Sequence, residues 1–335
     1  KAKVKYFILE GIQPNPRLSS VYKGIEICKN ENIDFLLAVG GGSVIDAAKA
    51  IALGACYDGD VWDFYEHKAK PEKALSLGSV LTLAATGSEM NGNSVITKEE
   101  TQRKLAVGYY ILYPQFSILD PEYTYTVNAY HTAAGIADIM AHIFEQYFSH
   151  TQATDVQDRI AEGLLKVCIK YGPIAIQEPN NYEARANILW AGTLALNSLI
   201  GNGKIQDWAT HIIEHELSAY YDISHGAGLA VLFPQWLRFV LNNKTLPKFL
   251  DYAKNVWDIY DLSDEYKAAN LAINKTAEFF KSLGLPIRLK DMNIDDKLFE
   301  KMAENIIEFE GADGYIGSFK KLSKSDIIEI YKNAL

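Results

Sequence analysis

Short apolar runs alternate with amphipathic stretches along the first 125 residues. The apolar runs predict strands at 4–9, 35–39, 79–83 and 116–119, and the amphipathic stretches predict helices at 18–30 and 44–53. This alternation of strand and helix indicates right-handed βαβ units and a parallel sheet. The run at 35–39 contains no polar position, which is typical of a strand that is buried on both faces.

Helical periodicity takes over from about residue 130. One apolar stripe recurs at helical spacing and consists of Ile136, Ile139, Met140, Ile143, Phe144 and Tyr147. Further helices are expected at 157–170, 181–199, 207–220 and 248–260. The change of pattern falls near the Leu-Asp-Pro turn at 119–121. We therefore predict an α/β domain over residues 1–125 and an all-helical domain over residues 126–335, with the cleft between them as the default site.

The composition excludes several classes of protein. Of the 335 residues, 48% are hydrophobic and 22% are charged, which is typical of a globular protein. The formal net charge of −9 argues against a nucleic-acid partner, because the phosphate backbone is itself negative. Three cysteines without CxxC spacing fit the reducing cytoplasm. The longest uncharged run, 186–203, contains several polar side chains, so we expect a buried helix there and no membrane span.

Three consecutive glycines and a serine, at positions 40–43, lie between a predicted strand and a predicted helix. Backbone N–H groups at such a helix start can bind a phosphate, whose negative charge the helix dipole favours. The run matches neither GxGxxG nor a P-loop, and a tight turn is the plainer alternative. A second polar loop, from Thr82 to Asn91, follows the next predicted strand. Both loops would emerge at the carboxyl edge of the sheet, where open α/β folds bind nucleotides.

Most of the seven histidines fall on or beside two predicted helices. Asp138 and His142 are four residues apart, and so are His211 and His215, which places each pair on one helix face. His225 follows in a Ser-His-Gly loop. A carboxylate and several imidazoles on two facing helices would suit a divalent ion such as Zn²⁺ or Fe²⁺. Hydrogen-bonded core histidines are the alternative for any one of them.

A competing motif runs through one of these helices. Residues 211–215 spell H-x-x-E-H, in which both histidines would bind zinc and the glutamate would activate water. This pattern is short, and it leaves Asp138, His142 and the glycine loops unexplained. The sequence contains neither the Tyr-x-x-x-Lys of short-chain dehydrogenases nor the G-x-S-x-G of serine hydrolases.

Five segments together resemble the iron-containing, group III alcohol dehydrogenases. They are GGGSVIDAAKAIA at 40–52, LTLAATGSEMNGNSVIT at 81–97, LDPEYTYT at 119–126, GIADIMAHIFEQY at 135–147 and WATHIIEHELSAYYDISHGAGLA at 208–230. The segments occur in the family's order and at its spacing. Within the family, the chain is most similar to NADPH-dependent aldehyde reductases of the butanol dehydrogenase type.

The resemblance implies an N-terminal Rossmann-like, dinucleotide-binding domain and a C-terminal helical domain that binds the metal and carries the catalytic residue. The metal ligands that it implies are Asp138, His142, His211 and His225. His215 then lies near the nicotinamide as a proton relay, which replaces the inverted-protease interpretation. The implied reaction interconverts short primary alcohols and aldehydes, such as butanol and butanal, with NAD(P)(H) and one Fe²⁺ or Zn²⁺ as a Lewis acid.

The same resemblance implies the residues that meet the cofactor. Those for the pyrophosphate are Gly41, Gly42 and Ser43, and those that line the rest of the cofactor are Thr82, Thr86, Asn91, Lys104 and Tyr123. NADP(H) is favoured over NAD(H). Family members begin with a further segment that carries the first Rossmann strand and the turn that discriminates NADP from NAD. We expect that segment to be missing from this sequence, which begins with Lys1.

An aromatic cleft without a basic cluster predicts small neutral aldehydes and alcohols as substrates, and the resemblance implies a homodimer. Two other functions stay open. A metal-dependent lyase resembling dehydroquinate synthase would need several basic residues around the cleft, and there is no Lys or Arg between Trp208 and Trp236. A non-catalytic binder of metal and nucleotide would hold the cofactor without turnover.

Overall fold

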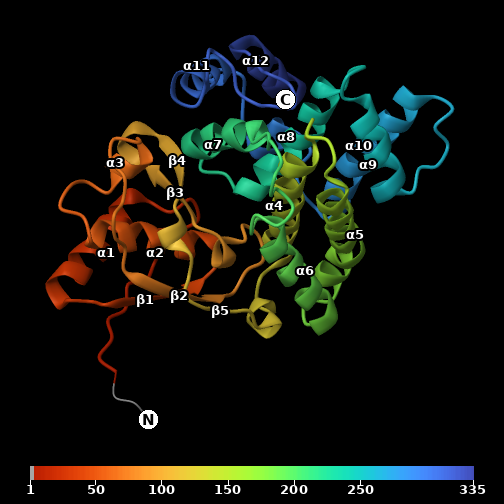
Figure 1. Cartoon of the computed structure of the whole chain (residues 1–335). Coiled ribbons are helices and arrows are strands. Elements are labelled where there is room, and N and C mark those ends of the chain that lie inside the picture. The colour runs from red at the N-terminus through yellow and green to blue at the C-terminus, as the bar shows by residue number, and fades with distance from the viewer. Residues whose placement is uncertain (1–3) are drawn as a thin grey trace.

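A computed structural model describes residues 4–335, in which an α/β part and a helical part lie side by side (Figure 1). The elements of the α/β part are α1 (Leu18–Glu31), β1 (Phe35–Gly40), α2 (Gly42–Ala55), α3 (Trp62–Tyr65), β2 (Ser76–Leu81), β3 (Asn93–Lys98), β4 (Arg103–Gly108) and β5 (Ser117–Ile118). The elements of the helical part are α4 (Ala129–Tyr147), α5 (Asp155–Gln177), α6 (Tyr182–Ala195), α7 (Ala209–Tyr221), α8 (His225–Val240), α9 (Leu246–Trp257), α10 (Glu265–Ser282), α11 (Phe299–Phe309) and α12 (Lys324–Asn333). The predicted combination of a parallel-sheet domain and a helical domain is confirmed.

The main sheet consists of three parallel strands in the order β1-β2-β5. Strand β1 pairs with β2 along its whole length, and α2 packs on the face where Ala38 and Leu81 are buried with Ile45. On the other face, Leu37 and Val39 are 54% and 57% exposed. The prediction that the run at 35–39 is buried on both faces is therefore wrong. Its side chains alternate in burial, and only the α2 side contributes to the core.

Two further segments of the α/β part differ from prediction. Residues 4–9 form no strand, and Val4 and Ile8 are exposed because no strand of the described chain pairs with this segment. A hairpin that the sequence did not predict follows the second polar loop. Its strands β3 and β4 pair antiparallel, from Asn93 opposite Gly108 to Lys98 opposite Arg103.

Helix α4 forms the centre of the helical part. All its side chains from Thr132 to Tyr147 are buried, because α5, α6 and α8 pack around it. The predicted apolar stripe belongs to this helix. Small residues on its other sides, such as Ala137 and Ala141, are also buried and allow the neighbouring helices to approach. The stripe therefore identified one face of a helix that is buried on all sides.

The predicted helices at 18–30, 44–53, 157–170, 207–220 and 248–260 are confirmed as α1, α2, α5, α7 and α9, of which α5 continues to Gln177. Helix α6 ends at Ala195, earlier than predicted, so residues 196–208 form a loop that leads to α7. Within residues 4–335, no helix has both the length and the apolar character that a bilayer crossing needs.

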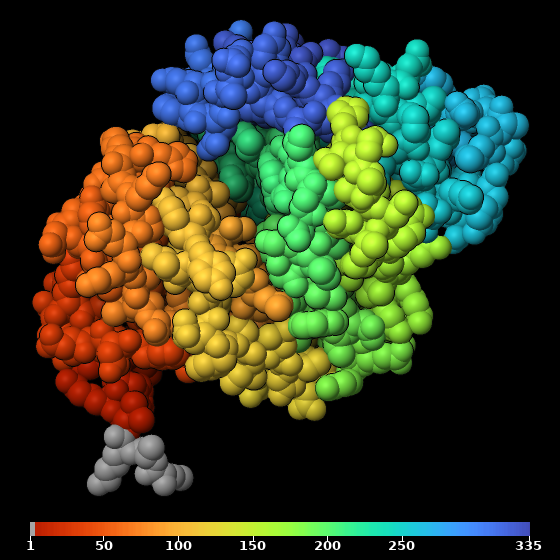
Figure 2. All heavy atoms as spheres, in the orientation of Figure 1, coloured from red at the N-terminus to blue at the C-terminus, as the bar shows by residue number. Residues whose placement is uncertain are grey.

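A recess separates the two parts of the chain on the face shown in the space-filling view. It lies between the orange and gold residues of the α/β part and the green residues of the helical part (Figure 2). The two parts also meet directly, because α7 packs on β4 (Figure 1). Groups at the carboxyl edge of the sheet and groups on α4, α7 and α8 are therefore held in one structure.

Candidate active site

The two polar loops that were predicted to bind a cofactor lie in contact at the carboxyl edge of the sheet. The backbone N–H of Thr82 donates to the carbonyl of Gly40 at 3.0 Å, where the paired strands end. A Cβ atom on Gly42 would lie 2.2 Å from Oγ1 of Thr86. Only glycine therefore lets the second loop approach the start of α2 this closely. The prediction that both loops emerge at one edge is confirmed.

The start of α2 is open to a ligand at its backbone. Gly41 is the N-cap residue, and no side chain caps the helix. Gly42 and Ser43 form the beginning of the first turn, so their N–H groups have no intrahelical acceptor. Such groups, with the positive end of the helix dipole, suit a phosphate.

Asn91 has a different environment from the glycines. Its side chain is buried, and its amide nitrogen donates to the carbonyls of Gly87 at 2.9 Å and Leu196 at 3.2 Å. Its Oδ1 accepts from the buried ammonium of Lys49 at 3.1 Å. The Asn91 side chain therefore stabilises the conformation of the second loop through these hydrogen bonds. Its contact with a cofactor stays a prediction.

The predicted metal ligands gather between α4, α7 and the start of α8. Asp138, His211 and His225 each offer one ligand atom, and these atoms lie within 4.8 Å of one another. Asp138 Oδ1 lies 3.9 Å from His211 Nε2, 3.6 Å from His225 Nε2 and 3.6 Å from His142 Nδ1. The ring centroid of His142 is 4.6 Å from that of His211. The fold thus brings together four residues that come from three separate helices.

Three of these ligand atoms are buried and have no hydrogen-bond partner. They are Oδ1 of Asp138, Nδ1 of His142 and Nε2 of His211. Such atoms are uncommon in folded proteins, because each loses its hydration without compensation. Oδ1 of Asp138 lies within 4 Å of both nitrogens, which fits a cation, but His142 lies outside the group of Asp138, His211 and His225 whose ligand atoms are all within 4.8 Å of one another. A carboxylate with imidazoles is a donor set that Zn²⁺ and Fe²⁺ accept. The residues present therefore fit a divalent metal.

Burial controls the protonation of this cluster. It raises the pKa of Asp138 to about 7, and it lowers the pKa of His211 to about 4 against the opposing charge of Asp138. The pKa values of His142 and His225 lie well below the ordinary value for histidine, again chiefly through burial. The imidazoles are consequently neutral at neutral pH, which is the form that binds metals.

His215 lies next to the cluster but outside the group formed by Asp138, His211 and His225. Its ring centroid is 5.4 Å from that of His225. Burial, and then the positive charge of Lys104, holds its pKa well below the ordinary value. His215 is therefore a neutral imidazole at neutral pH. The ligand atoms of His215, Glu214 and His225 instead lie within 4.8 Å of one another.

Two of the predicted cofactor residues, Lys104 and Tyr123, differ in burial and in distance from the histidines. Lys104 is buried, and its Nζ donates to Oδ1 of Asn15 at 3.0 Å and lies 3.5 Å from Nδ1 of His225. Tyr123 is half-exposed on a short 3-10 helix, Pro121–Thr124, that packs on α6. Among the described contacts, Lys104 reaches the histidine cluster and Tyr123 does not. Both contacts with a cofactor stay predictions.

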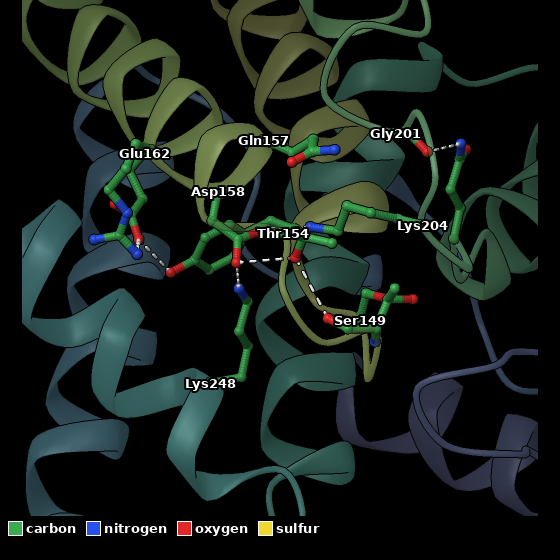
Figure 3. Close-up of polar contacts among 12 residues, drawn as sticks. Ser149, Thr154, Gln157, Asp158, Glu162, Gly201, Lys204 and Lys248 are labelled. Atoms are coloured by element: carbon green, nitrogen blue, oxygen red, sulfur yellow. Dashed lines mark hydrogen bonds and ion pairs between the residues drawn. The ribbon is translucent and has the colours of Figure 1, made fainter.

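The loop at 196–208 brings an aromatic side chain against the cluster. The ring centroid of Trp208 lies 5.3 Å from that of His211. The loop is anchored on α5, where Nζ of Lys204 lies 2.6 Å from Oδ1 of Asp158 (Figure 3). Trp208 is therefore presented to the site by a segment that polar contacts hold in place.

Two buried carboxylates face the histidines, of which sequence reasoning missed Glu145 and considered Glu214 only as the glutamate of the H-x-x-E-H motif. Glu145 lies beside His211, and Oε2 of Glu214 contacts Nδ1 of His225. Neither glutamate side chain is exposed. Glu145 is seven residues after Asp138, a spacing that places both on one face of α4, so helical periodicity could have indicated it.

Two family descriptions match the chain. "Iron-containing alcohol dehydrogenase" matches residues 1–121, and "Fe-containing alcohol dehydrogenase family, C-terminal" matches residues 132–335. The two matches together leave few residues of the chain unmatched.

Individual relatives extend this similarity. The NADH-dependent butanol dehydrogenase A of Clostridium acetobutylicum is 49% identical over 331 residues, which cover 99% of this chain and 85% of the relative. The NADPH-dependent aldehyde reductase YqhD of Escherichia coli is 40% identical over 301 residues, which cover 89% of this chain and 77% of the relative. The solved structure of NADH-dependent butanol dehydrogenase A from Thermotoga maritima has a TM-score of 0.92 at 40% identity, and the match covers 97% of this chain and 82% of that chain.

Proposed function

Because this chain belongs to the iron-containing alcohol dehydrogenase family, we propose that Asp138, His142, His211 and His225 hold the divalent metal which that family implies. The chain is an NAD(P)-dependent oxidoreductase of alcohols and aldehydes. The observation that carries the proposed metal site is that Asp138, His211 and His225 offer ligand atoms within 4.8 Å of one another, while Oδ1 of Asp138 and Nε2 of His211 are buried without a hydrogen-bond partner.

When bound, the metal supplies Lewis-acid polarisation of the substrate oxygen and the nicotinamide supplies or accepts the hydride. The chain's own residues position these reactants. Gly41, Gly42 and Ser43 present backbone N–H groups to the pyrophosphate, and Thr82 and Thr86 of the second loop line the cofactor beside them. In this scheme the dinucleotide-binding domain comprises residues 1–125 and the catalytic domain comprises residues 126–335.

His215 moves the proton in this proposal. Its neutral imidazole can accept the proton of an alcohol and return it in the direction of aldehyde reduction. The support for this role is its place beside His225, at the edge of the metal cluster. Trp208 shields one side of the cluster with an apolar surface, which favours small neutral substrates over charged ones.

Cofactor preference is the least constrained part of the proposal. We expected NADP(H), and the names of the relatives divide on this point. The relative at 49% identity is named for NADH, whereas the reductase at 40% identity is named for NADPH. The preference for NADP(H) stays a prediction, as do the homodimer and the cytoplasmic location.

The test is an assay of NADH and NADPH oxidation by the metal-loaded protein with butanal, with and without a chelator. Chelator-sensitive turnover supports the proposal, and the ratio of kcat/KM for the two cofactors decides the preference. No turnover with either cofactor, in protein shown to contain its metal, would contradict the proposed substrates. A binder that does not catalyse, or a lyase, would then explain the same metal site.

A further inference from the structure

One buried side chain contacts both a predicted metal ligand and the residue that flanks it. Glu145 is on α4, its side chain is not exposed, and no lysine or arginine lies among its hydrogen-bond partners in the described chain. Its Oε1 accepts from the backbone N–H of His211 at 3.0 Å and lies 3.1 Å from Nδ1 of the same residue. Its Oε2 accepts from the backbone N–H of Trp208 at 3.0 Å.

The contact with Nδ1 determines what the other ring nitrogen of His211 can do. An ionised carboxylate can only accept, so with Glu145 ionised Nδ1 carries the proton in this contact. Nε2 then bears the lone pair, and it is the nitrogen that faces Asp138 Oδ1 at 3.9 Å without a hydrogen-bond partner. A carboxylate placed behind a histidine in this way selects the tautomer and orients the ring for a metal.

The second oxygen acts on the backbone that leads into α7. Trp208 has φ 68°, a left-handed conformation that is uncommon for a bulky residue. Such a conformation persists only where the surroundings hold it, and the hydrogen bond from the Trp208 N–H to Glu145 is one of the contacts that do so. The backbone conformation of Trp208 in turn places its ring 5.3 Å from the ring of His211.

We propose that Glu145 is a positioning residue that orients His211 toward the metal and holds Trp208 as the adjacent wall of the substrate site. This inference rests on the proposed metal ligands. Glu145 itself contacts neither metal nor substrate. One oxygen contacts His211 and the other contacts the backbone of Trp208. The metal affinity and the position of the Trp208 ring therefore both depend on this one carboxylate.

A second buried carboxylate provides a matched control. Asp207 also lies at the start of α7 and accepts backbone N–H groups, from Ala209 at 3.0 Å and from Ser318 and Phe319 at 2.7 Å each. It contacts no histidine in the described structure. A role that is only structural predicts similar effects of Glu145→Gln and Asp207→Asn, whereas a positioning role predicts different ones.

The experiment measures the Zn²⁺ affinity of the purified full chain by competition with a chromogenic chelator. We expect Glu145→Gln to weaken Zn²⁺ binding by about 10- to 100-fold, and Asp207→Asn to change it by less than about twofold. The Co²⁺-loaded proteins give a second readout, because the visible spectrum reports ligand geometry. Glu145→Gln is expected to alter that spectrum, and Asp207→Asn is not.

Equal Zn²⁺ affinity of Glu145→Gln and the unsubstituted protein, or equal losses in both variants, would overturn the inference. If Glu145→Gln does not fold, Glu145→Asp replaces it, because it keeps the charge and shortens the reach to His211. A folded Glu145→Asp with full Zn²⁺ affinity would also overturn the inference. Failure of the unsubstituted protein to bind any metal would instead contradict the proposed function, so the two failures are distinguishable.

Discussion

The ammonium of Lys104 lies 3.7 Å from the carboxylate of Glu214, and both side chains are buried. Removal of one partner from such a pair leaves a charge without compensation. We therefore expect Lys104→Met to lower the free energy of unfolding by about 3 kcal/mol, measured by urea denaturation. The control is the pair of Lys68 and Glu66, in which Lys68 is exposed and Glu66 is partly buried, and Lys68→Met should cost less than about 1 kcal/mol. Similar decreases in the free energy of unfolding in the two variants would contradict a stabilising contribution from the buried pair of Lys104 and Glu214.

The metal site predicts a clear difference between two histidines. His211→Ala removes one of the unpaired ligand atoms, so the protein is expected to lose its metal and its turnover. His131 lies on the same helix as Asp138 and is exposed, and His131→Ala should keep both. Elemental analysis of the purified variants and the butanal assay check this prediction. An active, metal-loaded His211→Ala protein would refute the ligand assignment.

If His215 relays the proton, its substitution should lower the rate without releasing the metal. His215 is not among the four proposed metal ligands, so His215→Ala should retain the metal. Loss of the group that moves the proton is expected to lower kcat by about 100-fold or more. Metal content and steady-state kinetics measure the two effects. A variant with unchanged kcat would rule out this role for His215.

The close approach of Gly42 to Thr86 predicts a cofactor defect. The Cβ atom of Gly42→Ala would lie 2.2 Å from Thr86 Oγ1, so the two loops must separate. Overpacking typically costs about 1–3 kcal/mol, and 1.4 kcal/mol corresponds to about a tenfold change in affinity. We expect the KM for the nicotinamide cofactor to rise about tenfold or more. Gly163→Ala on α5, where nothing lies within 4 Å of the added atom, should leave that KM unchanged.

The carboxylate of Asp158 predicts a pH-dependent stability (Figure 3). Burial alone would raise its pKa, but the hydrogen bonds from Lys204 and Lys248 outweigh burial and hold the pKa below its ordinary value. A depressed pKa means that Asp158 stabilises the fold above the pKa of the unfolded chain. This contribution is lost as the pH falls through the folded pKa.

Substitution of Asp158 tests the predicted loss of stability at low pH. Asp158→Asn should lower the free energy of unfolding by about 2 kcal/mol at neutral pH, since hydrogen bonds to charged groups are replaced. The difference from the unsubstituted protein should shrink as the pH falls through the folded pKa of Asp158. The control is Asp155→Asn at the exposed first residue of the same helix, which should have little effect. A constant difference at all pH values would contradict the assignment.

Local patterns were sufficient for much of the fold and indicated Asp138 and several histidines as candidates for a metal site, whereas the choice of His225 over His215 came from the family resemblance. Asp138 and His142 could be paired because their spacing places them on one face of α4. Gly42 could be singled out because it opens a helix directly after a strand. Periodicity did not reveal the exposed face of β1, because Leu37 and Val39 are as apolar as residues that are buried on both sides. The failure at 4–9 has a related cause, since a strand forms only where a partner strand is present.

The sequence by itself determined the order of the elements, the glycines at the helix start and the residue types able to bind a metal. These features depend on periodicity and chemistry within a few neighbouring residues. Only the tertiary structure decided that Glu145 faces His211, that Glu214 faces His225 and that Lys104 lies beside Glu214 and His225. These contacts join helices and a hairpin that are far apart in the chain. Their geometry follows from packing of the whole core, which no local pattern encodes.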